Sequence, residues 1–158
     1  MSKILLFLAI LIALMSNPKV SVMTNNHYQY QFEYQADWSV LAGDGYVSLF
    51  SPDATGALDL ENGLKVEFVP VKQNMVGTYL INTSEFLFYK KVATGYGELF
   101  IVYEEQEDFF ELFSTFVVKD AQIMVWGHIT GPQENWEKHK QEYVNIISSL
   151  KPAVERAP

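Results

Sequence analysis

The sequence predicts an α+β fold, in which an antiparallel β-sheet meander carries a C-terminal amphipathic helix on one face. Segments that alternate apolar and polar residues are separated by short polar turns, as antiparallel strands are. Apolar residues then recur at helical spacing near the C-terminus. The chain has 158 residues, of which 49% are apolar and 15% aromatic, and this is enough for one domain with a buried core. We expect the domain to cover residues 27–152.

Residues 1–23 are expected to lie outside this domain, as a secretory signal peptide or a short N-terminal anchor. Lys3 precedes twelve uninterrupted apolar residues, Ile4 to Met15, and a polar break follows, which is the layout of an export signal. Twelve helical residues cover about 18 Å, against about 30 Å of membrane hydrocarbon. A small-x-small cleavage triplet is missing, so a cleaved signal and a retained anchor both stay open. We expect a periplasmic or secreted protein whose only contact with a membrane is this segment.

The first strand is predicted where "HYQYQFEY" alternates strictly from His27, because a strand with one wet face has this period. A hairpin with its turn at 43–45 follows, and then a strand in "GLKVEFVPV" that ends near Pro70. Residues 73–93 fit either a strand or a helix that covers the second face of the sheet. Both alternatives stay open.

The second half of the chain is predicted to form the meander and the helix. Three strands, "ELFIVYEE", "DFFELFSTFVV" and "AQIMVWGHIT", are separated by short polar turns. Alternate residues of the last strand share a face, so one face carries Ile123, Val125, Gly127 and Ile129, and the other carries Met124, Trp126, His128 and Thr130. After Gly131-Pro132, a favourable helix entry, apolar residues recur at helical spacing until Pro152: Trp136, Tyr143, Ile146, Ile147 and Leu150. Residues 153–158 are expected to form a frayed tail.

Composition and motifs exclude several classes of function. The chain has no cysteine, which excludes disulfides, thiolate nucleophiles and a lipid-bearing cysteine. Nineteen acidic residues outnumber eleven basic ones, so nucleic acid is not an expected partner. The chain lacks a Gly-x-Ser-x-Gly elbow and a phosphate-binding glycine loop. We therefore do not expect an enzyme; an uncharacterised hydrolase ranks third, because a spatial pair of carboxylates is invisible in a sequence.

A ligand or partner face is predicted on the central sheet. Strand 109–118 is apolar on both faces, so both faces of the sheet must be covered. The C-terminal helix covers one. If residues 73–93 leave the other open, a protein partner or a small apolar ligand would bind there, and the candidate residues are Met124, Trp126, His128, Phe110 and Phe116.

The sequence offers two candidate metal sites. Carboxylates near the turn at 107 could supply oxygen ligands to a divalent cation: Glu104, Glu105, Glu107 and Asp108. Their spacing does not force them to converge, so a solvated hairpin is favoured and no cofactor is expected. His128 and His139 could approach each other only if the helix covers the face that carries His128, and two ligands fall short of the three or four that zinc requires.

The order of these segments resembles the PsbP-like family, the extrinsic photosystem II subunits and their bacterial and organellar relatives. The resemblance rests on "YQADW", "LFSPD", "KVEFVPV" and the ending "GHITGPQENWEKHKQEYVNIISSLKP", and it covers residues 28–152. It implies an antiparallel sheet with helices packed on its faces, and a non-catalytic binding or assembly role that is sometimes metal-associated. Family members of the oxygen-evolving type carry N-terminal basic segments for docking, whereas only Lys19 lies near the start of the expected mature chain. We expect an exported binding or assembly module of the cell envelope with a protein partner; the alternative is a carrier of a small apolar ligand.

Overall fold

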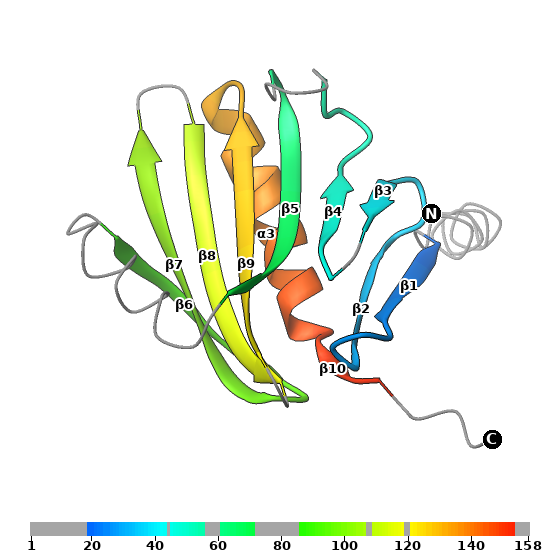
Figure 1. Ribbon diagram of the computed structural model, residues 1–158. Coiled ribbons are helices and arrows are strands. Elements are labelled where there is room, and N and C mark those ends of the chain that lie inside the picture. Colours follow the sequence, from blue (N-terminus) through cyan, green and yellow to red (C-terminus); the bar gives the residue numbers. More distant parts are fainter. Residues whose placement is uncertain are drawn as a thin grey trace, which may run out of the picture.

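Two antiparallel sheets and a C-terminal helix make up the part of the chain that the structure describes (Figure 1). The structure is a computed structural model that describes residues 19–43, 45–55, 61–71, 86–106, 109–118 and 121–153. The elements are β1 (Val20–Asn25), β2 (Tyr30–Gln35), β3 (Ser39–Ala42), β4 (Val47–Phe50), β5 (Gly63–Val71), β6 (Leu87–Thr94), β7 (Gly97–Gln106), β8 (Phe109–Val118), β9 (Ala121–Thr130), α3 (Gln133–Ser148) and β10 (Lys151–Pro152). The predicted α+β class, with an antiparallel sheet and a C-terminal helix, is confirmed.

The large sheet has seven strands in the order β3-β4-β5-β9-β8-β7-β6, with antiparallel neighbours. The predicted meander is its β7–β8–β9 part, and the predicted hairpin is β3–β4, where Gly45 has a φ of 89° that favours glycine. Residues 87–94 form the edge strand β6, while residues 73–85 lie outside the described residues. Among the described residues α3 is the only helix, so the second helix considered for this region is not found there.

The small sheet, β1-β2-β10, joins the two ends of the described chain. The strand β1 pairs with β2 over all its residues, although sequence analysis placed residues 20–25 outside the domain. The predicted strand start at His27 is also wrong. The Asn25 side-chain oxygen accepts the N–H groups of His27 and Tyr28, at 3.1 and 3.0 Å, and so holds residues 26–29 in a turn.

The described chain ends in a short strand that is held by hydrogen bonds. The strand β10 pairs with β2, and the Ala153 N–H donates to the Gln29 carbonyl at 2.9 Å. Residues 154–158 of the predicted tail lie outside the described residues. No helix within the described ranges is long and apolar enough to cross a membrane.

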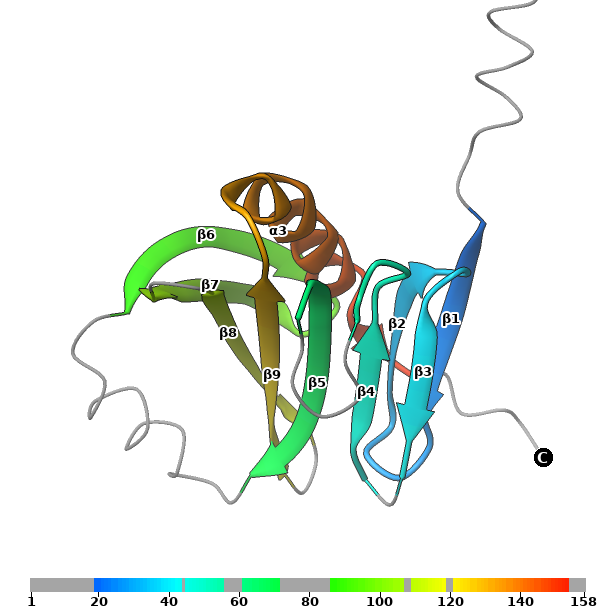
Figure 2. The same cartoon turned by 90° about the horizontal axis from the view of Figure 1, so that it is seen from above.

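The helix α3 lies across one face of the large sheet, which we call the inner face; the opposite one is the outer face (Figure 2). A Cβ atom added to Gly127 would lie 2.5 Å from the Tyr143 ring, so glycine makes room for this ring at the centre of β9. The Tyr143 hydroxyl donates to the Val125 carbonyl at 2.9 Å. The inner face therefore carries Ile123, Val125 and Ile129, which share one face as predicted, and all three are buried.

An aromatic cluster packs the small sheet against the large one. Phe32 of β2 stacks on Phe68 of β5, with ring centroids 4.2 Å apart and planes within 3°. Its neighbour Tyr30 contacts Phe116 of β8 edge to face at 5.4 Å. Burial raises the pKa of the Tyr30 hydroxyl to about 12, so this side chain stays neutral at physiological pH.

Candidate functional site

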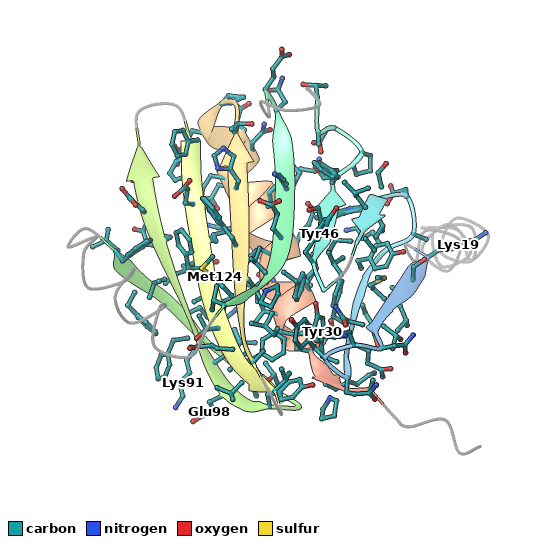
Figure 3. The ribbon with its side chains drawn as sticks, in the orientation of Figure 1. Lys19, Tyr30, Tyr46, Lys91, Glu98 and Met124 are labelled. Carbon is teal, nitrogen blue, oxygen red and sulfur yellow. The ribbon has the colours of Figure 1, made fainter. Side chains whose placement is uncertain are left out.

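The five residues predicted to form one ligand or partner site lie on opposite faces of the large sheet. Because α3 covers the face of Val125, the side chains of Met124, Trp126 and His128 lie on the outer face, as Figure 3 shows for Met124. Phe110 and Phe116 lie on the inner face, so their assignment to the same site is wrong.

The two misassigned phenylalanines belong to the core. Phe110 stacks on Trp136 of α3 with centroids 4.7 Å apart, and Phe116 packs against Tyr30. The residue that accompanies Trp126 is Phe113, which is paired with it across β8 and β9 and stacks on it at 5.4 Å. Pairing the two strands from their shared turn would have found Phe113, because residues directly opposite each other share a face.

A polar row crosses the outer face next to these aromatic residues. Lys65, His128, Glu111 and Glu104 occupy successive paired positions on β5, β9, β8 and β7. The His128 Nδ1 lies 3.3 Å from a Glu111 carboxylate oxygen, and the Phe109 ring stacks on the imidazole at 4.8 Å. These contacts fix the orientation of the imidazole and leave it partly exposed at the surface. Such a row can position polar contacts for a partner.

The apolar residues of the outer face change from buried to exposed towards β6. Phe113 is almost fully buried and has Phe86 against its ring at 4.7 Å. At the edge, Phe88 of β6 and Phe100 of β7 are 63% and 58% exposed, with centroids 6.2 Å apart. We call this pair the aromatic rim. Lys91 lies over the Phe100 ring at 5.9 Å.

The predicted metal sites are not supported by the described residues. Glu104 and Glu105 are consecutive residues of β7 and therefore point to opposite faces, while Glu107 and Asp108 lie outside the described residues. His139 belongs to α3 on the inner side and His128 to the outer face, so the two histidines do not meet, as expected for a helix on the Val125 face. In the described ranges no three His, Asp or Glu side chains are placed to hold a metal ion.

His139 is instead a buried residue at the centre of a polar cluster. Its Nδ1 contacts a Glu142 carboxylate oxygen, and its Nε2 lies 3.2 Å from Asp53 Oδ2. Asp53 also accepts hydrogen bonds from Lys138, at 2.5 Å, and from the Ser51 hydroxyl, at 2.7 Å. Because the Ser51 hydroxyl donates to a carboxylate rather than to the imidazole, the cluster does not have the geometry of an activated serine. It holds the loop after β4 against α3.

The cluster predicts an acid-dependent loss of stability. Partial burial would raise the pKa of Asp53, but the hydrogen bonds from Lys138 and Ser51 and the nearby His139 hold it well below its usual range. The ionised Asp53 carboxylate therefore makes its full contribution to the free energy of unfolding above the unfolded-state pKa of about 3.9. This contribution is lost as the pH falls towards the folded-state pKa. We expect the melting temperature of Asp53→Asn to depend less on pH between about pH 4 and 2 than that of the wild type. If the melting temperatures of the variant and the wild type fall equally over this pH range, the assignment is contradicted.

Solved structures share this arrangement of strands and helix. Cyanobacterial PsbP (CyanoP) from Synechocystis sp. PCC 6803 is 14% identical over 85% of this chain and 93% of its own, with a TM-score of 0.53. The Ran-binding protein Mog1p of Saccharomyces cerevisiae is 6% identical over 86% of this chain and 96% of its own, with a TM-score of 0.55. A protein of Bacteroides thetaiotaomicron has a TM-score of 0.48 at 13% identity, and this chain spans about half of its length, 48%. No protein-family model and no curated protein matches the sequence.

The first two likenesses show a PsbP/Mog1-like fold, in agreement with the fold that the resemblance to the PsbP-like family implied. At such low identity they show the fold alone.

Proposed function

We propose that the protein is a non-enzymatic binding or assembly module of the cell envelope, which docks on a protein partner through the aromatic rim. The observation that supports this most directly is the exposure of two adjacent phenylalanines, Phe88 and Phe100, on one edge of the large sheet. Aromatic residues that cluster at the surface are frequent anchors of protein interfaces, because burying them removes a large apolar area from water.

The form of the edge favours docking through side chains over the addition of a partner strand. The register of β6 against β7 shifts between Phe88 and Lys90, and such a bulge interrupts the regular row of backbone groups that an added strand would pair with. Lys91 forms an ion pair with Glu98 at 2.5 Å beside the rim (Figure 3). An apolar centre flanked by charged residues is the usual composition of a transient interface.

Export of the chain rests on residues 1–23 and is part of the proposal. The Mog1p neighbour is named for binding a protein, Ran, which supports the idea that a fold of this type can present a protein-binding surface. A hydrolase has less support, because Ser51 in the described polar cluster donates to Asp53 and not to a base.

The test is recovery of the partner from the protein's own cell envelope after crosslinking. We expect the double variant Phe88→Ala/Phe100→Ala to recover at least about tenfold less partner than the wild type, since interface anchors typically contribute that much to affinity. The matched control is Leu41→Ala, which removes a 55% exposed residue from β3, the opposite edge of the same sheet. Equal recovery by the double variant, or an equal loss with the control, would contradict the proposal.

A further inference from the structure

We propose that β1 is an interface strand, through which two copies of the chain pair edge to edge in an antiparallel arrangement. It is the outermost strand of the small sheet (Figure 1), and within the described ranges no strand pairs with its other edge. Such an open edge presents backbone N–H and C=O groups that can pair with a further strand. The aromatic rim belongs to β6 and β7 of the large sheet, so this interface is independent of the proposed protein docking.

The backbone groups of three β1 residues point to the open edge. The Lys19 carbonyl accepts the Ala36 N–H at 2.7 Å, so the backbone groups of Lys19 are directed to the side of β2. This direction alternates from residue to residue along an antiparallel strand. The N–H and C=O groups of Val20, Val22 and Thr24 are therefore directed away from β2. The edge offers them in one regular row.

The hydrogen bonds of the neighbouring strand support this assignment. Val22 lies opposite Glu33 of β2. The Glu33 N–H donates to the Ser149 hydroxyl at 2.8 Å, on the side away from β1, as expected for a pair whose residues do not bond to each other. The N–H of Val22 can therefore be removed without breaking a hydrogen bond between β1 and β2.

The open edge of β1 lacks the features that protect the other edges of the described sheets. Edge strands are commonly protected by lysine, proline, a bulge or a short length. The strand β6 has a bulge and carries Lys90 and Lys91, β10 consists of Lys151 and Pro152, and β3 has four residues. In contrast, β1 has six residues, all uncharged, and pairs with β2 without a shift in register.

A second copy of the chain is the partner that fits this edge. An antiparallel pair centred on Val22 places Val22 opposite itself and Val20 opposite Thr24, so every outward residue of each copy gains a partner. Val20 and Val22 are 58% and 56% exposed, and the pairing sets each beside a β-branched side chain of the other copy. Like charges do not oppose each other, because Lys19 of one copy lies opposite Asn25 of the other.

Cysteine crosslinking tests this register, because the chain has no cysteine of its own. In the proposed pair the two Cα atoms of residue 22 lie about 5.5 Å apart, a separation that a disulfide spans. We expect the whole chain with Val22→Cys to give a disulfide-linked dimer on a non-reducing gel after mild oxidation. The matched control is Val117→Cys, a 57% exposed position on β8, which should remain monomeric. Equal crosslinking of the two variants, or none with Val22→Cys, would overturn the pairing.

A proline at the same position tests whether backbone hydrogen bonds hold the dimer. Val22→Pro removes one outward donor from each copy, and an edge strand tolerates proline where the N–H faces outward. Val22→Thr keeps both the donor and the β-branched shape. In sedimentation velocity of the whole chain, Val22→Pro should raise the dissociation constant of the dimer at least about tenfold, whereas Val22→Thr should change it less than about threefold.

The same measurement can refute the proposal. A pair of six-residue strands is a small interface, so we expect the dimer to dissociate in the micromolar range. A wild type that is still monomeric at about 100 μM, or a dimer that Val22→Pro does not weaken, would overturn it. The double variant Phe88→Ala/Phe100→Ala should dimerise like the wild type. Loss of the dimer in that variant would assign self-association to the aromatic rim and contradict a role of β1.

Discussion

Gly127→Ala is expected to lower the free energy of unfolding by about 2–3 kcal/mol, the upper part of the usual range for overpacking a core. The added Cβ would lie 2.5 and 2.6 Å from two carbons of the Tyr143 ring. That ring is fully buried, and its hydroxyl is held by the Val125 carbonyl. Neither partner can move without disturbing the contact between α3 and β9. Denaturant unfolding followed by tryptophan fluorescence would measure the change.

A double-mutant cycle tests whether the Tyr143 ring is the cause. Tyr143→Leu removes the ring and destabilises the protein by itself, but it also makes room for a Cβ at position 127. The double variant should therefore lose less free energy of unfolding than the two single variants together, with a coupling energy of about 1 kcal/mol or more. Strict additivity would place the origin of the Gly127 effect elsewhere.

His139→Ala is expected to destabilise the protein by about 3 kcal/mol at neutral pH. The imidazole is completely buried and has a carboxylate oxygen at each ring nitrogen, from Asp53 and from Glu142. Its removal would leave a cavity and would take a partner from the largely buried Glu142 carboxylate, and both effects are costly in a protein interior. Thermal and denaturant unfolding at pH 7 would measure the loss.

His128→Ala is the matched control for this substitution. His128 is also paired with a carboxylate, that of Glu111, but it lies on the outer face and is partly exposed. Pairs near the surface contribute about 0–1 kcal/mol, and water reaches the His128 side chain, which is 28% exposed. Similar losses from the two variants would show that burial does not distinguish the two histidines energetically.

The two histidines show which part of the site could be predicted from the sequence. Alternation along β9 separated Val125 from His128 correctly, because strand geometry imposes a period of two residues. Alternation within one strand does not say which residues of the next strand share its face. That depends on register, which places Phe113 opposite Trp126 and places Phe110 opposite Ile129.

Other features depend on contacts between residues distant in the sequence. The residues of β1 follow an apolar segment, and two of its valines are exposed. They form a strand because β2 pairs with them. His139 meets Asp53 across 86 positions. No local pattern encodes such a contact, so the polar cluster around His139 could not be predicted from the sequence.

The small sheet has a consequence for the order of folding. Lys151 and Pro152 pair with Gln31 and Tyr30, so this sheet is completed by the last described strand of the chain. Pairings between residues so far apart form slowly, because a long loop must close before any contact compensates for its entropy. During synthesis β2 cannot acquire its full set of neighbours until β10 has emerged. The edge of β2 that pairs with β10 therefore stays open while the rest of the described chain is synthesised.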